Sequence, residues 1–165
     1  MLNRIAFFVL VVLASGPVLS ATATLRLNDP TDRVVVNHDS ALNPASAITI
    51  EAWIRPTSDV CSTIVGKDFV NGYWFGYCGG GLRYYYRGST QVTSSATIPV
   101  NEWSHVAVSY DRSVVRFYLN GEALATFSRP GSMPADDSPL GIGGEGASSS
   151  FPDGLFPFSG WMSED

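Results

Sequence analysis

The 15 acidic residues are the first candidates for chemistry, because glycoside hydrolysis uses a pair of carboxylates on either side of the scissile bond. On a β-strand, two side chains share a face only when they are two or four positions apart. No two acidic residues of this chain have either spacing. The sequence therefore offers no carboxylate pair on one strand, although carboxylates assembled from separate strands remain an alternative.

Nucleophilic catalysis has no better support. The imidazoles are His38 and His105, and the chain has no Gly-x-Ser-x-Gly elbow. His105 lies in an alternating run beside Trp103, where a structural histidine is expected, and His38 lies in a polar stretch, where solvation is expected. We therefore predict that the protein is not an enzyme.

Two cysteines, Cys61 and Cys78, lie in strand-like runs on either side of the polar stretch 67–72. A hairpin through that stretch would bring them together, and a disulfide closing such a loop stabilises the fold by about 3 kcal/mol. Two buried free thiols are the alternative. Two cysteines with two distant histidines do not match the ligand spacing of a structural zinc site.

Pairing of the cysteines requires an oxidising compartment, and residues 1–20 predict export to one. Arg4 precedes an apolar run at 5–14, which would rise only about 15 Å as a helix, half of the hydrocarbon thickness. Pro17 then breaks the run. This pattern predicts a signal peptide cleaved after residue 20, or as late as residue 23, with an N-terminal anchor as the alternative. The mature protein is expected to be secreted, extracellular or in the cell envelope, without a stable membrane span.

The densest aromatic cluster could bind a ligand, because flat rings stack on sugar faces. In the run 82–87, the alternation places Arg83, Tyr85 and Arg87 opposite an apolar face. These three are the candidate ligand-binding residues if the apolar face is buried. Core packing is the alternative for most of the aromatic residues, and Trp53 and Trp103 are expected to pack in the core or against a sheet.

The composition of the chain excludes several classes of protein. The chain has 165 residues, of which 15% are charged and 12% aromatic, with a formal net charge of −5. This length fits one domain, and so few charges with so many aromatics exclude a disordered chain. The acidic balance argues against nucleic acids and anionic membranes as partners, because both require a basic surface.

Short runs rich in β-branched and aromatic residues recur from residue 24 onward, with turn residues between them. An Asn-Gly pair at 120–121 marks a hairpin. No window carries a sustained helical period. The runs predict an all-β fold with two antiparallel sheets packed as a jelly-roll sandwich. They are residues 25–27, 34–36, 48–54, 61–65, 73–78, 82–87, 103–110, 114–119, 123–127, 140–142 and 158–162.

Six segments carry a family resemblance over residues 24–165. They are residues 48–56, 63–68, 103–111, 115–122, 139–144 and 156–160. In this order they resemble the bacterial laminin-G-like (LamG-like) jelly-roll domains of the concanavalin A-like lectin/glucanase superfamily. The glucanase motif Glu-x-Asp-x-x-Glu of that superfamily is absent from this sequence.

The resemblance implies a Ca²⁺ site of hard oxygen ligands in the acidic turn, at Asn28, Asp29 and Asp32. A turn that caps its own backbone without metal is the alternative. The turn departs from the family pattern, and the chain stops at Glu164 and Asp165, where the family continues into a last strand. We therefore expect a laminin-G-like domain at 24–165 that lacks its C-terminal strand.

The resemblance also implies a secreted or cell-surface binding or adhesion module, whose partner is an extracellular glycan or protein. A polysaccharide-active hydrolase and a structural spacer of a larger surface protein are the alternatives. No cofactor other than Ca²⁺ is expected. The ligand and the oligomeric state do not follow from the sequence.

Overall fold

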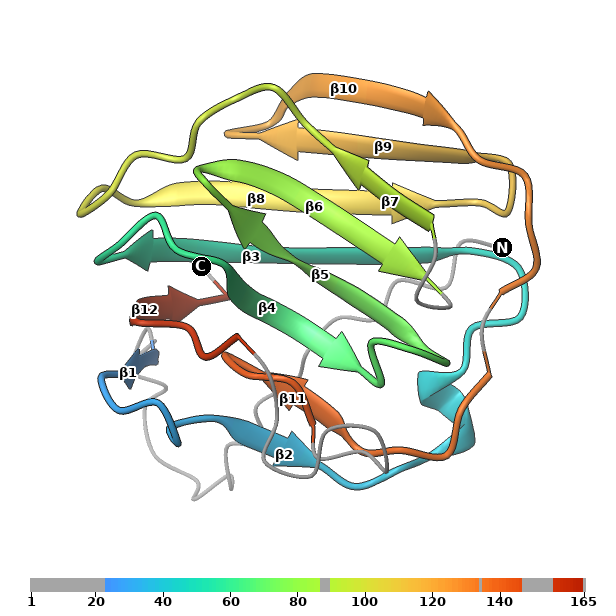
Figure 1. Ribbon diagram of the computed structural model, residues 1–165, viewed down its shortest axis with the longest axis horizontal. Coiled ribbons are helices and arrows are strands. Elements are labelled where there is room, and N and C mark those ends of the chain that lie inside the picture. Colours follow the sequence, from blue (N-terminus) through green and yellow to red (C-terminus); the bar gives the residue numbers. More distant parts are fainter. Residues whose placement is uncertain (1–22, 87–89, 134, 147–155, 165) are drawn as a thin grey trace, which may run out of the picture.

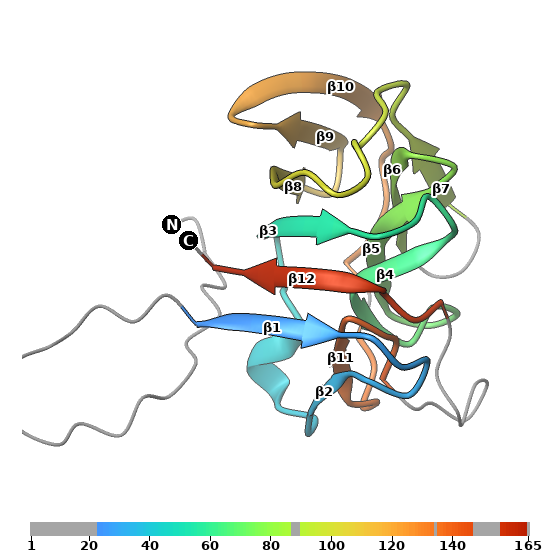
Figure 2. The same ribbon diagram turned by 90° about the vertical axis from the view of Figure 1, so that its left-hand side faces the viewer.

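Twelve strands form two antiparallel sheets in a computed structural model that describes residues 23–86, 90–133, 135–146 and 156–164. The sheets pack face to face, as Figures 1 and 2 show from two sides. Sheet I has the order β1 (Thr24–Leu27), β12 (Gly160–Ser163), β3 (Ile48–Pro56), β8 (Ser104–Tyr110), β9 (Val114–Leu119) and β10 (Glu122–Ser128). Sheet II has the order β2 (Val34–Val36), β11 (Leu140–Ile142), β4 (Ser62–Lys67), β5 (Tyr73–Cys78), β6 (Gly81–Tyr86) and β7 (Thr90–Thr93). The predicted all-β sandwich is confirmed.

The core lies between the sheets, because alternate residues of each strand point inward. In β3, Ile48, Ile50 and Ile54 are buried while Glu51 is exposed, as the alternation predicts. Tyr86 of sheet II stacks on a tyrosine of sheet I, with 4.7 Å between ring centroids. The aromatic members of this core are Tyr73, Phe75, Tyr77, Tyr84, Tyr86, Tyr110, Phe117 and Phe158.

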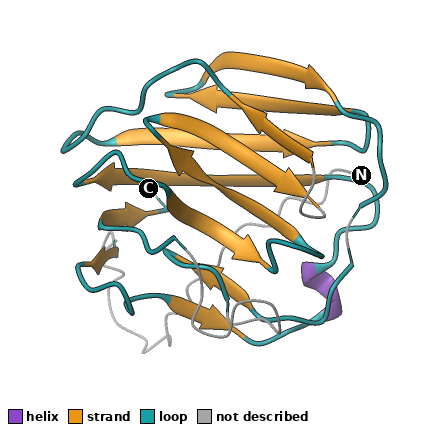
Figure 3. Cartoon of the chain, in the orientation of Figure 1, coloured by secondary structure: helices purple, strands orange, loops and turns teal. Residues whose placement is uncertain are grey.

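Two short elements are absent from the sequence prediction. Residues 90–93 form β7 and pair with β6, although residues 93–96 are expected to be a loop or a strand edge. The other is a 3-10 turn, η1 (Ser40–Leu42), which is coloured purple in Figure 3. Asp39 caps it, because its carboxylate accepts a hydrogen bond from the backbone N–H of Ala41 at 2.8 Å.

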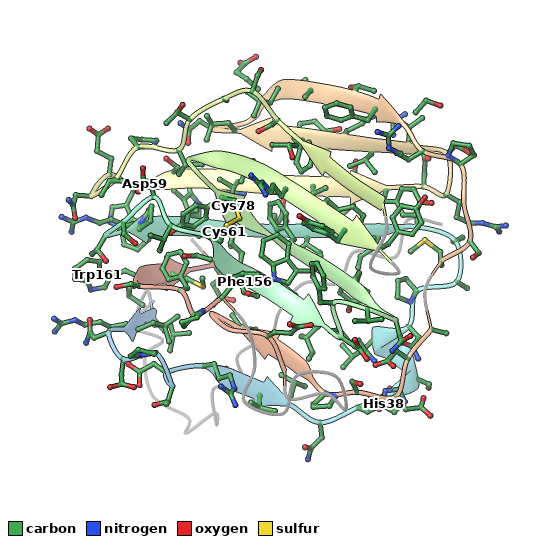
Figure 4. All side chains as sticks on the ribbon, in the orientation of Figure 1. His38, Asp59, Cys61, Cys78, Phe156 and Trp161 are labelled. Carbon is green, nitrogen blue, oxygen red and sulfur yellow. A yellow bond between two sulfur atoms is a disulfide. The ribbon has the colours of Figure 1, made fainter. Side chains whose placement is uncertain are left out.

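The predicted disulfide is confirmed, and Figure 4 shows it as a yellow bond between Cys61 and Cys78. It joins Cys61, just before β4, to Cys78, the last residue of β5, at the end of the hairpin away from the turn. The turn occupies the polar stretch after Lys67, where Asp68 accepts hydrogen bonds from the backbone N–H groups of Val70 and Asn71. The hairpin therefore forms where the sequence predicts it.

The strand β12 lies inside sheet I, between β1 and β3. It pairs with residues 53–56 of β3, so in the described part of the chain residues 48–52 have a strand partner only on the β8 side. The expected further strand after residue 165 stays a prediction. The predicted signal peptide at 1–20 lies outside the described residues. Within the described ranges, no helix is long and apolar enough to cross a membrane.

Candidate ligand-binding surface

The outer face of sheet I carries a row of large side chains across three neighbouring strands. Arg26 of β1 pairs in register with Trp161 of β12, which pairs with Arg55 of β3. Their chain neighbours Leu27, Met162 and Ile54 point into the core. The alternation of the strands therefore turns the row outward, and the labelled Trp161 lies at the periphery in Figure 4.

The guanidinium groups of both arginines lie on the indole ring of Trp161. The Cζ atom of Arg55 is 5.0 Å from the ring centroid, and that of Arg26 is 5.6 Å from it. Both distances are within the range of cation–π attraction. A hydrogen bond from Nε also holds each arginine. Nε of Arg26 donates to the side-chain oxygen of Asn28 at 3.0 Å, and Nε of Arg55 donates to the backbone carbonyl of Asn101 at 2.9 Å.

The next row of the same face contains an open depression. Trp53 of β3 pairs in register with His105 of β8, and their ring centroids are 5.4 Å apart. Trp103, just before β8, is 41% exposed. The depression is lined by Trp53, Trp103, His105, Asn120 and Gly121.

A hairpin turn forms one wall of this depression. Asn120 and Gly121 connect β9 to β10, and both have positive φ angles, 51° and 84°. The Asn-Gly pair tolerates these angles, which the two-residue turn requires. The side-chain oxygen of Asn120 accepts a hydrogen bond from the backbone N–H of His105 at 2.9 Å, which fixes the turn against β8.

We call the outward side chains of Arg26, Trp53, Arg55, Trp103, His105 and Trp161 the tryptophan platform. Trp103 is not in the core: it precedes β8, is 41% exposed and lines the depression on the outer face of the sheet. Trp53 is half-buried and packs against His105 across the sheet, as expected for a sheet-packing residue. His105 is partly exposed, with Nε2 3.8 Å from a carboxylate oxygen of Glu51.

The residues selected from the sequence lie on the other sheet. Arg83 and Tyr85 are half-buried on the outer face of β6, and their neighbours Leu82, Tyr84 and Tyr86 are in the core, as predicted. Arg87 lies outside the described residues. Whether these residues bind a ligand stays a prediction.

Tyr85 belongs to an aromatic cluster that covers this outer face of sheet II. Its ring centroid lies 4.7 Å from that of Phe69 and 5.4 Å from that of Trp74. Phe156, labelled in Figure 4, packs edge-on against Trp74 at 6.0 Å. Trp74 is only 1% exposed, so this cluster offers less ring surface to a ligand than the tryptophan platform does.

A buried carboxyl group, Glu145, lies beside that cluster with 0% exposure. It fits there because Gly66 has no side chain, and a Cβ at that position would lie 3.3 Å from the Cγ of Glu145. Oε1 accepts a hydrogen bond from the backbone N–H of Phe69, while Oε2 has no partner among the described residues. Burial raises the pKa of Glu145 to about 7, and the nearby carboxylate of Asp68 acts in the same direction.

The single lysine, Lys67, is fully buried at the end of β4. Its ammonium donates to the carbonyls of Asp136 and Ser138, the latter at 2.9 Å, and it is 3.9 Å from the carboxylate of Asp136. Burial lowers the pKa of Lys67, and the charges of the neighbouring aspartates oppose this effect. Lys67 thus fastens the loop around residue 136 to sheet II. His38, labelled in Figure 4, approaches the same loop with Nε2 3.3 Å from Asp137.

The acidic turn proposed for Ca²⁺ is held by its own hydrogen bonds. One oxygen of Asp32 accepts from the backbone N–H groups of Asn28 and Asp29, at 2.8 and 2.9 Å. One oxygen of Asp29 accepts from the backbone and hydroxyl of Thr31, which lowers the pKa of Asp29. Within the described ranges, no three His, Cys, Asp or Glu residues are grouped to hold a metal ion. Calcium binding at Asn28, Asp29 and Asp32 stays a prediction.

A laminin G family model described as "Concanavalin A-like lectin/glucanases superfamily" matches residues 28–157. No curated protein sequence matches the chain significantly.

Several solved structures share the fold. A proposed carbohydrate binding protein from Bacteroides ovatus has a TM-score of 0.67 at 20% identity, covering 86% of this chain and 42% of that one. The CBM40 module of a Ruminococcus gnavus sialidase, bound to α2,3 sialyllactose, has a TM-score of 0.62 at 14% identity, covering 88% and 93%. Domains LG4-5 of the mouse laminin alpha1 chain have a TM-score of 0.62 at 15% identity, covering 86% and 39%. The chain therefore spans about two fifths of the Bacteroides protein.

Proposed function

The chain belongs to the concanavalin A-like lectin/glucanases superfamily, and from this membership we propose that it is an extracellular, non-catalytic module that binds carbohydrate. Two of the similar structures support this proposal by their descriptions, one as a proposed carbohydrate binding protein and one as a module bound to a sialylated sugar. The disulfide supports an oxidising, extracellular setting.

The observation that carries the proposal is the exposure of Trp103 beside Trp53 on an open sheet face. A large exposed aromatic group is informative, because such rings are usually covered in a folded protein. The apolar face of a sugar ring stacks on an indole, while polar groups beside it bond the hydroxyls. His105 and Asn120 supply such groups within the same depression.

A hydrolase is less well supported than a binding module. Glu145, whose pKa is raised, lies near the carboxylate of Asp68, but both residues are buried and Asp68 is occupied in capping the β4–β5 turn. Neither lies on the tryptophan platform. Release of reducing sugar that is lost on changing Glu145→Gln would contradict the non-catalytic assignment.

We expect Trp103→Ala to weaken carbohydrate binding about tenfold. The loss of one stacking contact should cost about 1.4 kcal/mol of binding free energy, which corresponds to a factor of ten in affinity. The purified protein is first screened on a glycan array, and the affinity of both forms for the best glycan is then measured by calorimetry. Val35→Ala is the matched control, because Val35 is 48% exposed on β2 at the edge of the other sheet. Equal losses in both variants, or no glycan bound by the unchanged protein, would contradict the assignment.

We also propose that Ca²⁺ binds the acidic turn, and we expect Ca²⁺ to raise the melting temperature of the protein. The Asp32→Asn variant should lose this shift, because the turn then offers one anionic ligand fewer. Asp59→Asn is a control for charge, since Asp59 is exposed at another loop. If Ca²⁺ raised the melting temperature of the Asp32→Asn variant by the same amount, the ion would bind somewhere other than the acidic turn.

A further inference from the structure

The arginines of the tryptophan platform are arranged to hold anions. A guanidinium group stacked on an indole ring keeps its plane fixed, while the N–H groups on its edge remain free to donate. The Cζ atoms of Arg26 and Arg55 lie over the same ring, that of Trp161, at 5.6 and 5.0 Å from its centroid. Each guanidinium has five N–H donors, and the hydrogen bonds within the described residues use only the Nε donor of each.

Among the residues that the structure describes, neither arginine is neutralised by a salt bridge, although the acidic turn begins at Asn28, the hydrogen-bond partner of Arg26. The chain has 15 acidic residues against 10 basic ones, yet within the described residues no carboxylate forms a salt bridge with Arg26 or Arg55. Arg116, on the same sheet, pairs with Asp111 at 2.9 Å. Two ordered cations without a counter-ion, in an acidic protein, leave an anionic ligand as their natural partner.

We infer that the ligand of the platform is an acidic polysaccharide, whose carboxylate or sulfate groups accept hydrogen bonds from Arg26 and Arg55. This inference rests on the proposed function, because it assigns the chemical class of the same ligand. A sugar ring stacks in the depression at Trp53 and Trp103, and the acidic groups of the chain lie over Trp161. Arg26 and Arg55 stand on the two strands that flank β12, so their backbones are about 10 Å apart. A polymer with repeated acidic groups can reach both.

The platform also gives the bound chain a direction. Along β3, Arg55 lies two residues after Trp53 and Glu51 two residues before it, so opposite charges flank the same indole. Glu51 lies near the imidazole of His105, at 3.8 Å, and repels an acidic group at that end. The acidic groups of the ligand are therefore directed toward Arg55 and away from Glu51.

The test uses polysaccharides that differ only in charge. Polygalacturonate is compared with its methyl ester, and dextran sulfate with dextran, each by calorimetry with the purified protein at low and at physiological salt. We expect at least tenfold tighter binding to an acidic member than to its neutral partner, and a weaker preference as salt rises. The double variant Arg26→Gln, Arg55→Gln should lose this preference, so that its affinities for the charged and the neutral member become equal.

A second double variant, Arg112→Gln with Arg129→Gln, removes the same total charge at positions off the platform and should keep the preference. Should the first double variant not fold, Arg26→Gln alone serves, because Arg26 is exposed on an edge strand. Equal affinity for charged and neutral members, or equal losses in the two double variants, would overturn the inference and leave the proposed function standing. Absence of binding to every polysaccharide and to the glycan array would overturn both.

Discussion

Replacing Glu145 with glutamine should stabilise the protein by about 3 kcal/mol at pH 8 and change its stability little at pH 4. The pKa of this carboxyl group is raised from 4.5 to about 7 in the folded protein, chiefly by burial. The folded state therefore holds its proton more tightly than the unfolded chain does. The stability that this proton provides is fully present below pH 4.5, and it is lost as the pH rises through 7.

Glutamine keeps the carbonyl oxygen that accepts from the backbone N–H of Phe69 and removes the charge that burial penalises. Urea unfolding of both forms at pH 4, 6 and 8 measures the effect. The difference between them should grow with pH. Glu122→Gln is the control, because Glu122 is exposed on β10. A difference that is the same at all three pH values would show that Glu145 does not titrate in this way.

The second large effect is expected from the disulfide. Changing both Cys61 and Cys78 to alanine should cost about 3 kcal/mol, since the bond closes a loop across 17 positions and restricts the unfolded chain. For a domain of this size, that loss lowers the melting temperature by roughly 10 °C.

Scanning calorimetry with and without a reducing agent separates this effect from cavity formation. The reductant should lower the melting temperature of the unchanged protein toward that of the double variant, and it should leave the variant unaffected. If the double variant melted at the same temperature as the unchanged protein, packing against the neighbouring strands would be enough to hold the hairpin.

Strand positions and their inward faces were predictable because they depend on local patterns. The alternation at Ile48, Ile50 and Ile54 sets the buried face of β3, and Asn120-Gly121 sets the β9–β10 turn. The cysteine pair was also predictable, because both residues belong to one hairpin. Each of these features is decided by residues close together in the sequence.

The tryptophan platform was not predictable in the same way. Arg26, Arg55, Trp103 and Trp161 are distant in sequence, and only the pairing of β1, β12 and β3 places the two arginines on one indole. The size and hydrophobicity of tryptophan favour burial, so the sequence alone does not indicate that Trp103 is 41% exposed. No local pattern indicates that a charged side chain such as Lys67 is buried, because its partners come from a loop about 70 residues away.

The pairing of β1 with β12 has a mechanical consequence. Thr24 and Ser163 are register partners, so the two ends of the described fold leave the sheet side by side. A force that pulls these ends apart loads the antiparallel pair from its open end, and its hydrogen bonds break one after another rather than together. Sheet I should therefore unzip at low force along this axis, while the Cys61–Cys78 bond would hold the β4–β5 hairpin closed and limit the extension. Under the proposed binding function, the direction of attachment would then govern the load that the module bears.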